Sequence, residues 1–352
     1  MYNYKIFTHF SSECEKILKD LETSSTLNFF QNPEYLKQLI KNSTNEIKLV
    51  VIFKEKLIVA VLPLEIKKFL IFKVLQWLGT NYADYCNPIL SKNFNTFLNK
   101  NEFFKLWERI LKEIGKFDLI FFNNQLAEIE TTFNPFVNYF SKMSPSKVYC
   151  IDLPKSFENY LERIKRKDKK HYYELHRTLI KNKKLNEISS VSFTVQDSLK
   201  DNMNIKEIIE FKKDHLLKKK IKNNFSRKFI NLFETLIEKK TIKFFLMSLK
   251  IQEKNISSCF GFIYKDTFYY YIPIIFPSEF DKFKPGKILI LEIIKWCIES
   301  NIKRFDFGLG NEKYKKHFSN KEINLYKHLS YHTFKGLMIY IGAIIFLKIK
   351  RL

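Results

Sequence analysis

The sequence is poor in glycine and cysteine, and each shortage excludes a class of protein. Its 352 residues include 8 glycines, which excludes a collagen-like repeat. The 5 cysteines are scattered singly and never form a Cys-x-x-Cys pair, so neither a disulfide framework nor a zinc ribbon is indicated. No Gly-x-Ser-x-Gly, His-Glu-x-x-His, P-loop or Gly-x-Gly-x-x-Gly segment occurs. The sequence therefore lacks the motifs typical of serine hydrolases, zinc proteases, NTPases and dinucleotide enzymes.

Long apolar runs are also missing. The first residues contain no cationic segment followed by an apolar stretch, so we expect no secretory signal. The apolar stretch at residues 337–347 is shorter than the ~20 residues of a membrane-spanning helix. Because Lys348, Lys350 and Arg351 follow it, we expect a terminal helix docked on the fold, with a membrane-surface anchor as the alternative. The unpaired cysteines favour a reducing cytoplasm.

Positive charge is what the sequence has in excess. It holds 61 Lys and Arg against 37 Asp and Glu, a formal net charge of +24, with 45% hydrophobic and 16% aromatic residues. The apolar content excludes a disordered chain, and the length predicts two domains. Only 7 of the cations are arginines, which indicates a compositional drift towards lysine rather than a dedicated nucleic-acid surface. The charge still attracts polyanions, phosphorylated ligands or an anionic membrane face.

The hydrophobic periodicity repeats once along the chain. Each half contains three short strands, a helix and a further strand. These segments are residues 47–53, 57–64, 72–78, 101–114 and 117–122 in the first half and 242–249, 256–264, 268–275, 287–300 and 304–307 in the second. We therefore predict an α/β fold with mixed sheets, built from two copies of one unit. The expected domains are residues 1–150 and 151–335, followed by an apolar and basic helix at 336–352.

A Pro-Gly turn opens the predicted helix of the second half. Unpaired amides at a helix N-terminus, together with the positive end of the helix dipole, hold phosphate oxygens. Gly286 would let a ligand approach the backbone after Pro285, while Lys284 and Lys287 add positive charge. Pro-Gly also starts many helices for purely steric reasons, which is the alternative explanation.

This order of elements resembles the GNAT-type acyltransferase domain of the BioF2-like/CelD family, a tandem pair of GNAT folds related to the FemABX aminoacyltransferases of peptidoglycan. The resemblance covers residues 29–318, and its most specific piece is DFGLGNEKYK at 306–315. Further matching segments are Leu62-Pro63-Leu64, Leu78-Gly79, Asp84-Tyr85, Leu153-Pro154 with Ser156 and Tyr160, His215, and Pro285-Gly286-Lys287.

The resemblance implies an acyl-coenzyme A, such as acetyl-CoA, as co-substrate. Its pyrophosphate would bind at Lys284, Pro285, Gly286 and Lys287, with Tyr270 as a further contact. The family also parts two central strands so that pantetheine can lie between them, and we place that opening between strands 256–264 and 268–275. The turn departs from the usual Arg/Gln-x-x-Gly-x-Gly/Ala pattern, since Phe283 precedes Gly286 and Ile288 follows it.

The implied reaction is attack by an amine on a thioester carbonyl, which needs a base and a proton for the leaving thiolate. His215 is our candidate base, because neutral imidazole suits pH 7. Asp306 would orient or deprotonate the amine, and Tyr314 would donate a proton. Each has a structural alternative: a core histidine, a cap of the following turn, and a residue of an ordinary helix surface.

Four residues are predicted to contact the acceptor. They are Asp84, Tyr85, Arg177 and Lys315. Arg177 belongs to residues 163–184, which carry ten cations against two carboxylates and form either a solvated helix face or a wall for a phosphorylated ligand. No metal site is predicted, because His328 and His332 have no acidic partner at a suitable spacing.

The sequence thus predicts a cytoplasmic N-acyltransferase that transfers an acyl group from acyl-CoA to an amine on a sugar nucleotide or an envelope polysaccharide precursor. The first alternative is a FemABX-type enzyme that uses aminoacyl-tRNA, the one role in which we expect a nucleic-acid partner. The second is a non-catalytic polyanion or membrane-surface binder. It ranks last because most aromatic residues lie in apolar strands rather than in exposed stacking positions.

Overall fold

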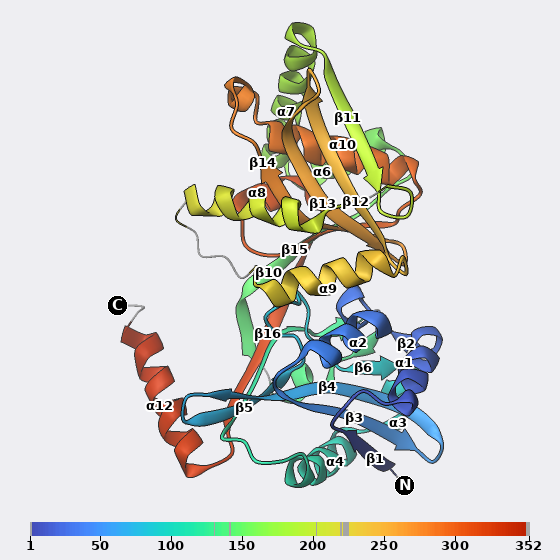
Figure 1. Cartoon of the computed structure of the whole chain (residues 1–352), viewed down its shortest axis with the longest axis vertical. Helices are drawn as coiled ribbons and strands as arrows, with labels where there is room; N and C mark the ends of the chain where they lie inside the picture. Colours follow the sequence, from blue (N-terminus) through green and yellow to red (C-terminus); the bar gives the residue numbers. More distant parts are fainter. Residues whose placement is uncertain are drawn as a thin grey trace. The chain divides into compact units, whose positions relative to one another are not determined.

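The computed structural model describes residues 2–129, 131–140, 142–201, 203–218, 220 and 225–349. The chain divides into two compact units. Unit 1 is formed by Met1–Ser146 together with Asn324–Leu352, and unit 2 by Lys147–Ile323. The last segment of the chain therefore returns to the first unit (Figure 1).

The strands of unit 1 follow one another in the order β1-β3-β4-β5-β7-β16, and β6 joins β4 to β2. The strands are β1 (Tyr2–Phe7), β2 (Ser25–Thr26), β3 (Glu46–Lys54), β4 (Leu57–Phe69), β5 (Phe72–Trp77), β6 (Ile89–Ser91), β7 (Leu119–Leu126) and β16 (Lys321–Tyr331), with a small pair of β8 (Glu128–Ile129) and β9 (Thr132–Phe133). The helices are α1 (Ser12–Ser24), η1 (Phe29–Gln31), α2 (Pro33–Asn42), α3 (Phe94–Phe97), α4 (Lys100–Glu113), α5 (Pro135–Phe140) and α12 (Phe334–Ile349).

The strands of unit 2 follow the order β10-β15-β14-β13-β12-β11. They are β10 (Lys142–Asp152), β11 (Val191–Asp197), β12 (Lys243–Ile251), β13 (Lys254–Tyr264), β14 (Thr267–Ile275) and β15 (Arg304–Leu309). The helices are α6 (Phe157–Lys167), α7 (Lys169–Ile188), α8 (Ile205–Lys218), α9 (Arg227–Glu238), η2 (Glu279–Phe283), α10 (Pro285–Glu299) and α11 (Lys313–Phe318).

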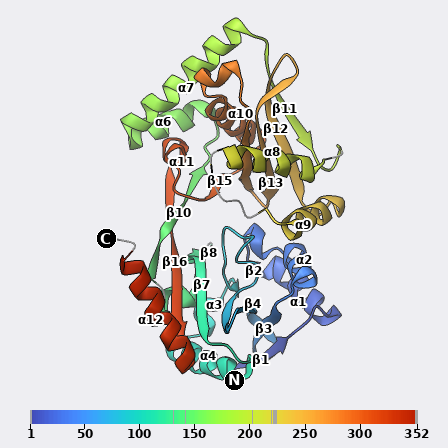
Figure 2. The ribbon, with the colours of Figure 1, turned by 60° about the vertical axis from the view of Figure 1, so that its left-hand side comes forward.

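Helices cover both faces of the unit 2 sheet (Figure 2). On one face, α6, α7, α10 and α11 pack in a core that includes Phe268, Tyr270, Phe305 and Phe307. On the other face, α9 packs its aromatic side chains against Tyr271 of β14, and α8 lies along the same strand. Neighbouring strand residues point to opposite faces, so Tyr270 packs in the core on one face and Tyr271 packs against α9 on the other.

The two units repeat one arrangement, as the periodicity predicts. In each unit an antiparallel hairpin leads to a strand that pairs in parallel with the strand after the next long helix. The parallel pairing has three residue pairs in both cases, from Val74↔Leu119 to Gln76↔Phe121 in unit 1 and from Thr267↔Arg304 to Tyr269↔Asp306 in unit 2. The mixed α/β fold and its internal repeat are thereby confirmed.

Among the helices that the structure describes, none has the length and apolar content needed to cross a bilayer.

Candidate functional site

The start of α10 keeps a free backbone donor. Lys284, the residue before the helix, adopts a left-handed conformation (φ 61°) and offers no side-chain cap to the helix. The amide of Lys287 donates to the Lys284 carbonyl (2.9 Å), and that of Ile288 donates to the same oxygen (3.3 Å). Pro285 has no N–H, so Gly286 supplies the one amide of this turn without an acceptor in the described part of the chain. The turn therefore presents a single free N–H rather than the row of unpaired amides that the sequence suggested.

Gly286 packs closely against strand β14. A Cβ atom built at this position would lie 3.1 Å from Cδ1 of Ile275, at the end of β14. That distance is tighter than ordinary van der Waals contact, so a larger residue would have to displace the Ile275 side chain. The lack of a side chain at Gly286 thus lets the start of α10 pack closely against the end of β14.

The charges beside the turn are partly neutralised by α7. Lys284 is exposed, whereas Nζ of Lys287 lies 3.5 Å from Oε2 of Glu174. The same carboxylate accepts a hydrogen bond from Arg177 (2.9 Å). Partial burial raises the pKa of Glu174, but the charges of Lys287 and Arg177 outweigh it and hold that pKa below its ordinary value. Glu174 therefore links Arg177 and Lys287, two residues predicted separately to contact a ligand.

The central strands part beside α10, although at a different pair from the one we expected. Strands β13 and β14 stay paired from Tyr264↔Thr267 to Ser257↔Ile275, interrupted by one bulge at Phe260/Gly261. The prediction of an opening between them was wrong. Pairing instead ends between β14 and β15 after Tyr269↔Asp306, although β14 continues to Ile275 and β15 to Leu309. The reason is connectivity: a tight turn closes the β13–β14 hairpin, whereas β15 is reached only after α10.

Tyr270 and Tyr314 lie on the α10 side of this opening. The Tyr270 ring is buried, stacks on Phe305 (centroids 5.8 Å apart) and meets Phe307 edge-on (5.7 Å). Tyr314, from α11, packs edge-on against the same Phe307 (6.4 Å). Burial raises the pKa of both phenols above the ordinary value. Both hydroxyls therefore keep their protons at neutral pH and can only donate or accept hydrogen bonds as neutral groups.

Asp306 and His215 lie on the other face. Asp306 stands between Phe305 and Phe307 on β15, so its side chain points away from their core. Its Oδ1 accepts a hydrogen bond from the Gly308 amide (2.7 Å), which is the turn-capping role that was the alternative for this residue. His215 is half-buried on α8, the helix that lies along β14 on this face. The candidate base and acid are thus divided between the two sides of the sheet.

Lys315 has a local role in the loop after β15. Its side chain is buried, and Nζ donates to the Leu309 carbonyl (2.8 Å) and pairs with Glu312 (2.9 Å). Asp84 and Tyr85 belong to unit 1, where the Tyr85 ring is buried and packs edge-on against Phe30 (5.8 Å). The structure therefore groups Arg177 with the α10 turn and gives Lys315 partners within its own loop.

Unit 1 closes the equivalent positions with its own residues. The first turn of α4 carries a capping box, in which Asn99 accepts from the Glu102 amide (3.0 Å) and Glu102 accepts from the Asn99 amide (3.1 Å). Beyond the end of the β5–β7 pairing, the Asn87 side chain accepts from the Leu126 amide (2.8 Å). Trp77 packs against Phe122 (4.6 Å) in the same region. The start of α4 thus carries a side-chain cap that α10 lacks, and a loop side chain binds β7 beyond the strand pairing.

The sequence reasoning missed two histidines next to the α10 turn. The rings of His171 on α7 and His317 on α11 lie 5.2 Å apart, and Nδ1 of His317 is buried with no hydrogen-bond partner in the described residues. Burial and the charge of Lys287 lower the pKa of His317, so the ring is held neutral. The i, i+3 spacing of His171 and Glu174 was the signal that could have placed this group on one helix face.

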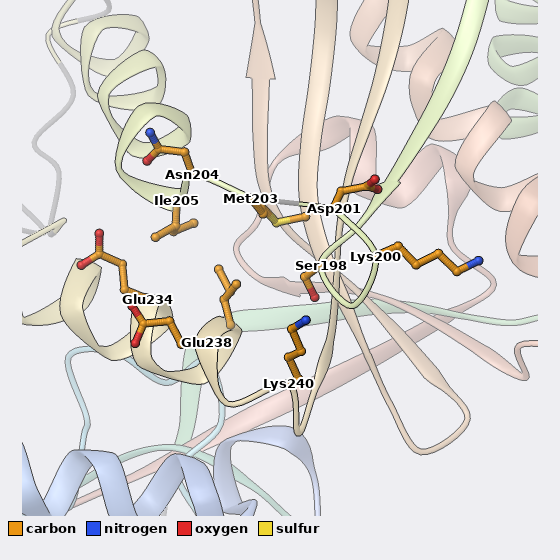
Figure 3. A pocket seen from close by; sticks show the side chains of 10 residues that line it. Ser198, Lys200, Asp201, Met203, Asn204, Ile205, Glu234, Glu238 and Lys240 are labelled. Atoms are coloured by element: carbon orange, nitrogen blue, oxygen red, sulfur yellow. The ribbon is translucent and has the colours of Figure 1, made fainter.

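A surface pocket of about 370 Å³ lies elsewhere in unit 2, between the loop after β11, the start of α8 and the end of α9 (Figure 3). Asp201, Glu234 and Glu238 line it together with Lys200 and Lys240. It contains none of the predicted site residues. In the described part of the chain, no group of histidine, cysteine or carboxylate side chains could hold a metal ion.

A domain-family model matches a large part of the second unit. Residues 175–316 match the family model described as the acetyltransferase (GNAT) domain. This stretch contains the α10 turn, the parted strands β14 and β15, and the Tyr314 segment. No curated protein sequence matches the chain.

Solved structures similar to this one extend over both units. FemX aligns with a TM-score of 0.58 and 10% identity, covering 92% of this chain and 96% of FemX. The C-terminal domain (DUF2156) of a putative lysylphosphatidylglycerol synthetase from Agrobacterium fabrum aligns with a TM-score of 0.53 and 9% identity. The alignment covers 95% of this chain and 96% of that domain. A conserved protein of unknown function from Bacteroides thetaiotaomicron VPI-5482 aligns with a TM-score of 0.51 and 10% identity. The alignment covers 93% of this chain and 99% of that protein. The chain therefore shares its fold with these three proteins over both units.

Proposed function

We propose that this protein is an N-acyltransferase that moves an acetyl or longer acyl group from acyl-CoA to an amine. The observation that carries the proposal is the free Gly286 amide at the start of α10, beside the point where β14 and β15 part. The match of residues 175–316 to the GNAT acetyltransferase domain supports the same reaction class. The side-chain cap of α4 and the loop bound to β7 in unit 1 support placing the site in unit 2.

The α10 turn suits a diphosphate. A free N–H at the positive end of a fifteen-residue helix attracts phosphate oxygens, and Lys284 adds an exposed cation. Lys287 is held by Glu174, so we expect it to move between that carboxylate and a bound phosphate. The acyl arm would then pass between β14 and β15, where the backbone groups of the strands no longer satisfy one another.

The division of candidate residues between two faces fits a two-substrate reaction. The amine would enter from the face of Asp306 and His215, where one of them takes its proton. The thioester would come from the face of Tyr270 and Tyr314. The amine nitrogen attacks the carbonyl carbon, the C–S bond breaks, and the thiolate takes a proton that the neutral Tyr314 hydroxyl can donate.

The acceptor and the cellular setting belong to the proposal as well. The family resemblance favours an amine on a sugar nucleotide or an envelope polysaccharide precursor, an assignment to the BioF2-like/CelD family, and a cytoplasmic enzyme. The excess of lysine suits an acceptor that carries a diphosphate.

A second candidate function is transfer from aminoacyl-tRNA, and one observation favours it. The helices α6 and α7 carry an exposed row of cations: Arg163, Lys165, Arg166, Lys167, Lys169, Lys170, Arg177, Lys183 and Lys184. A polyanion as large as tRNA could lie along them. Thermal shift separates the two donors, because acetyl-CoA alone would raise the melting temperature of an acyl-CoA enzyme, whereas stabilisation by tRNA alone, lost steeply with salt, would reverse the order.

The Gly286 position tests the proposed site directly. Gly286→Asp places a carboxylate where the diphosphate would lie, so we expect acetyl-CoA affinity measured by isothermal titration to fall by roughly a hundredfold or more. Gly286→Ala, which adds only the Cβ beside Ile275, should weaken binding less.

Gly342→Asp is the matched control, since its Cβ would meet nothing within 4 Å in α12. It should bind acetyl-CoA like the natural protein. If Gly286→Asp also kept full affinity, the α10 turn would not be the diphosphate site.

A further inference from the structure

The tip of the β4–β5 hairpin in unit 1 exposes large apolar side chains. Leu70 is 91% exposed and Ile71 is 76% exposed, in the turn between the paired strands β4 and β5. Phe69, beside them, stacks on Phe72 (5.6 Å) and is also partly exposed. Neighbouring apolar residues at a hairpin tip remain in water at a cost, because they bury nothing there.

The outer face of α12 is apolar as well. Phe334 is 79% exposed and Met338 is 58% exposed, and Ile341 and Ile345 continue the row. These four residues are spaced by four, three and four positions, so they form one stripe along the helix. A helix that packs on a water-soluble surface normally turns polar residues outward. The sixteen residues of α12 include only two charged ones, Lys335 and Lys348.

The two apolar segments meet at the start of α12 (Figure 1). Nζ of Lys335 donates a hydrogen bond to the Ile71 carbonyl. Gly336 lies directly on the backbone of Asp118, whose amide bonds to Lys73 at the start of β5. We call Leu70, Ile71, Phe334, Met338 and Ile341 together the apolar patch. Its members come from segments more than 260 positions apart and lie in one unit.

Lysines lie next to the apolar patch in the sequence. Lys67, Lys68 and Lys335 flank it, and Nζ of Lys67 lies over the Phe69 ring (4.7 Å). The sequence has no Asp or Glu at residues 66–73 or 334–352. The two carboxylates at its edge already have partners: Glu46 pairs with Lys73 (2.6 Å), and Asp118 accepts from Thr333 (2.8 Å).

We propose that the apolar patch docks unit 1 on the surface of an anionic lipid bilayer. Its aliphatic and aromatic side chains enter the boundary between headgroups and acyl chains, and the flanking lysines meet lipid phosphates. A second copy of the chain is a poorer occupant, because two like patches with cationic rims on a protein of net charge +24 repel each other. Charge complementarity therefore selects the bilayer.

This inference does not depend on the proposed acyl transfer, since every residue of the apolar patch lies in unit 1 and none belongs to the α10 turn. The apolar patch would bind membranes in a protein without catalytic activity. Conversely, acetyl-CoA binding can be intact in a protein that fails to dock.

Vesicle flotation of the full chain tests the docking surface. We expect the protein to float with vesicles of phosphatidylcholine and phosphatidylglycerol, and to float weakly with phosphatidylcholine alone. Ile71→Asp and Met338→Asp should each lower the bound fraction at least about fivefold, because a charge in the insertion face opposes burial. Lys67→Glu/Lys68→Glu should lower it on anionic vesicles only.

Leu57→Asp is the matched control, because Leu57 is also an exposed leucine in unit 1 but lies at the opposite end of β4. It should float like the natural protein. Unchanged flotation of Ile71→Asp and Met338→Asp, or none of the natural protein, would overturn the proposal. So would a dimer in lipid-free buffer that Met338→Asp dissociates, since the apolar patch would then face a second copy. Circular dichroism confirms that each variant is folded.

Discussion

At the scale of single residues, burial decides what the candidate groups can do. The side chains of Tyr270 and Tyr314 pack among aromatic rings, and burial raises the pKa of both hydroxyls. Both hydroxyls therefore stay protonated well above neutral pH. Lys315 donates a hydrogen bond to the Leu309 carbonyl in its own loop. Glu174 pairs with both Arg177 and Lys287. The chemistry of the proposed site would therefore depend on neutral donors and on charges that are already paired before a ligand arrives.

Tyr314→Phe tests the proton-donor role. We expect kcat for acetyl transfer to fall by roughly 10²-fold while KM for acetyl-CoA changes little, because only the transfer of a proton to the thiolate is lost. Burial raises the pKa of Tyr314 above the ordinary value of about 10, so the hydroxyl stays protonated at every pH below that value. The natural protein should therefore show no loss of kcat from this group up to about pH 10.

The corresponding control is Tyr340→Phe, a tyrosine of α12 in unit 1. It should leave both kinetic constants unchanged. A Tyr314→Phe variant with the natural kcat, measured with saturating acetyl-CoA, would remove Tyr314 from the reaction.

Residue types and spacing allowed part of the site to be predicted. The α10 turn was identified because Pro-Gly with flanking lysines has a physical meaning at a helix start. The group of Glu174, His171 and His317 was missed, because its members lie on two helices that only the tertiary structure brings together. The sequence also could not show that Asp306 and Tyr314 lie on opposite faces of the sheet, because it does not reveal the register of β15.

At the scale of elements, the same structural unit begins its long helix in two different ways. In unit 1 the box of Asn99 and Glu102 gives the Glu102 amide a side-chain acceptor at the start of α4. In unit 2 the left-handed Lys284 gives α10 no side-chain cap. A capped start is more stable, and an uncapped start leaves a donor for a ligand. The contrast supports our placing the proposed site in the second copy of the repeat.

Removing the cap of α4 should cost stability. Asn99→Ala deletes the acceptor of the Glu102 amide, and we expect the free energy of unfolding to fall by about 1 kcal/mol. Lys284→Ala is the control, because this residue makes no cap bond and alanine would keep the same strained conformation; its effect should stay within about 0.5 kcal/mol. Urea unfolding followed by circular dichroism measures both. Equal losses in the two variants would contradict the difference between the helix starts.

The strands and long helices of both copies were predictable because their apolar residues repeat with clear periods. The helix expected at residues 101–114 is α4 (Lys100–Glu113), and the one expected at 287–300 is α10 (Pro285–Glu299). The opening of the sheet was assigned to the wrong strands, since hydrophobic period shows where a strand lies but not with which neighbour it stops pairing. That depends on the turn and helix between the strands.

At the scale of the whole molecule, the chain leaves unit 1 and comes back to it. The second half of β16 pairs with β7 from Leu325↔Leu126 to Tyr331↔Leu119, and α12 then packs in unit 1. The repeat in the sequence gave no sign of this return, because the closing strand carries no counterpart in the first half. The return brings α12 to the β4–β5 hairpin and so forms the apolar patch.

Amide hydrogen exchange of the whole chain with and without acetyl-CoA would show whether the α10 start and the parted strands of unit 2 bind the acyl donor. We predict slower exchange on adding acetyl-CoA in peptides that contain Gly286 and in those covering the unpaired ends of β14 and β15, with no change at the capped start of α4. Unchanged exchange at Gly286, or protection confined to unit 1, would contradict the account.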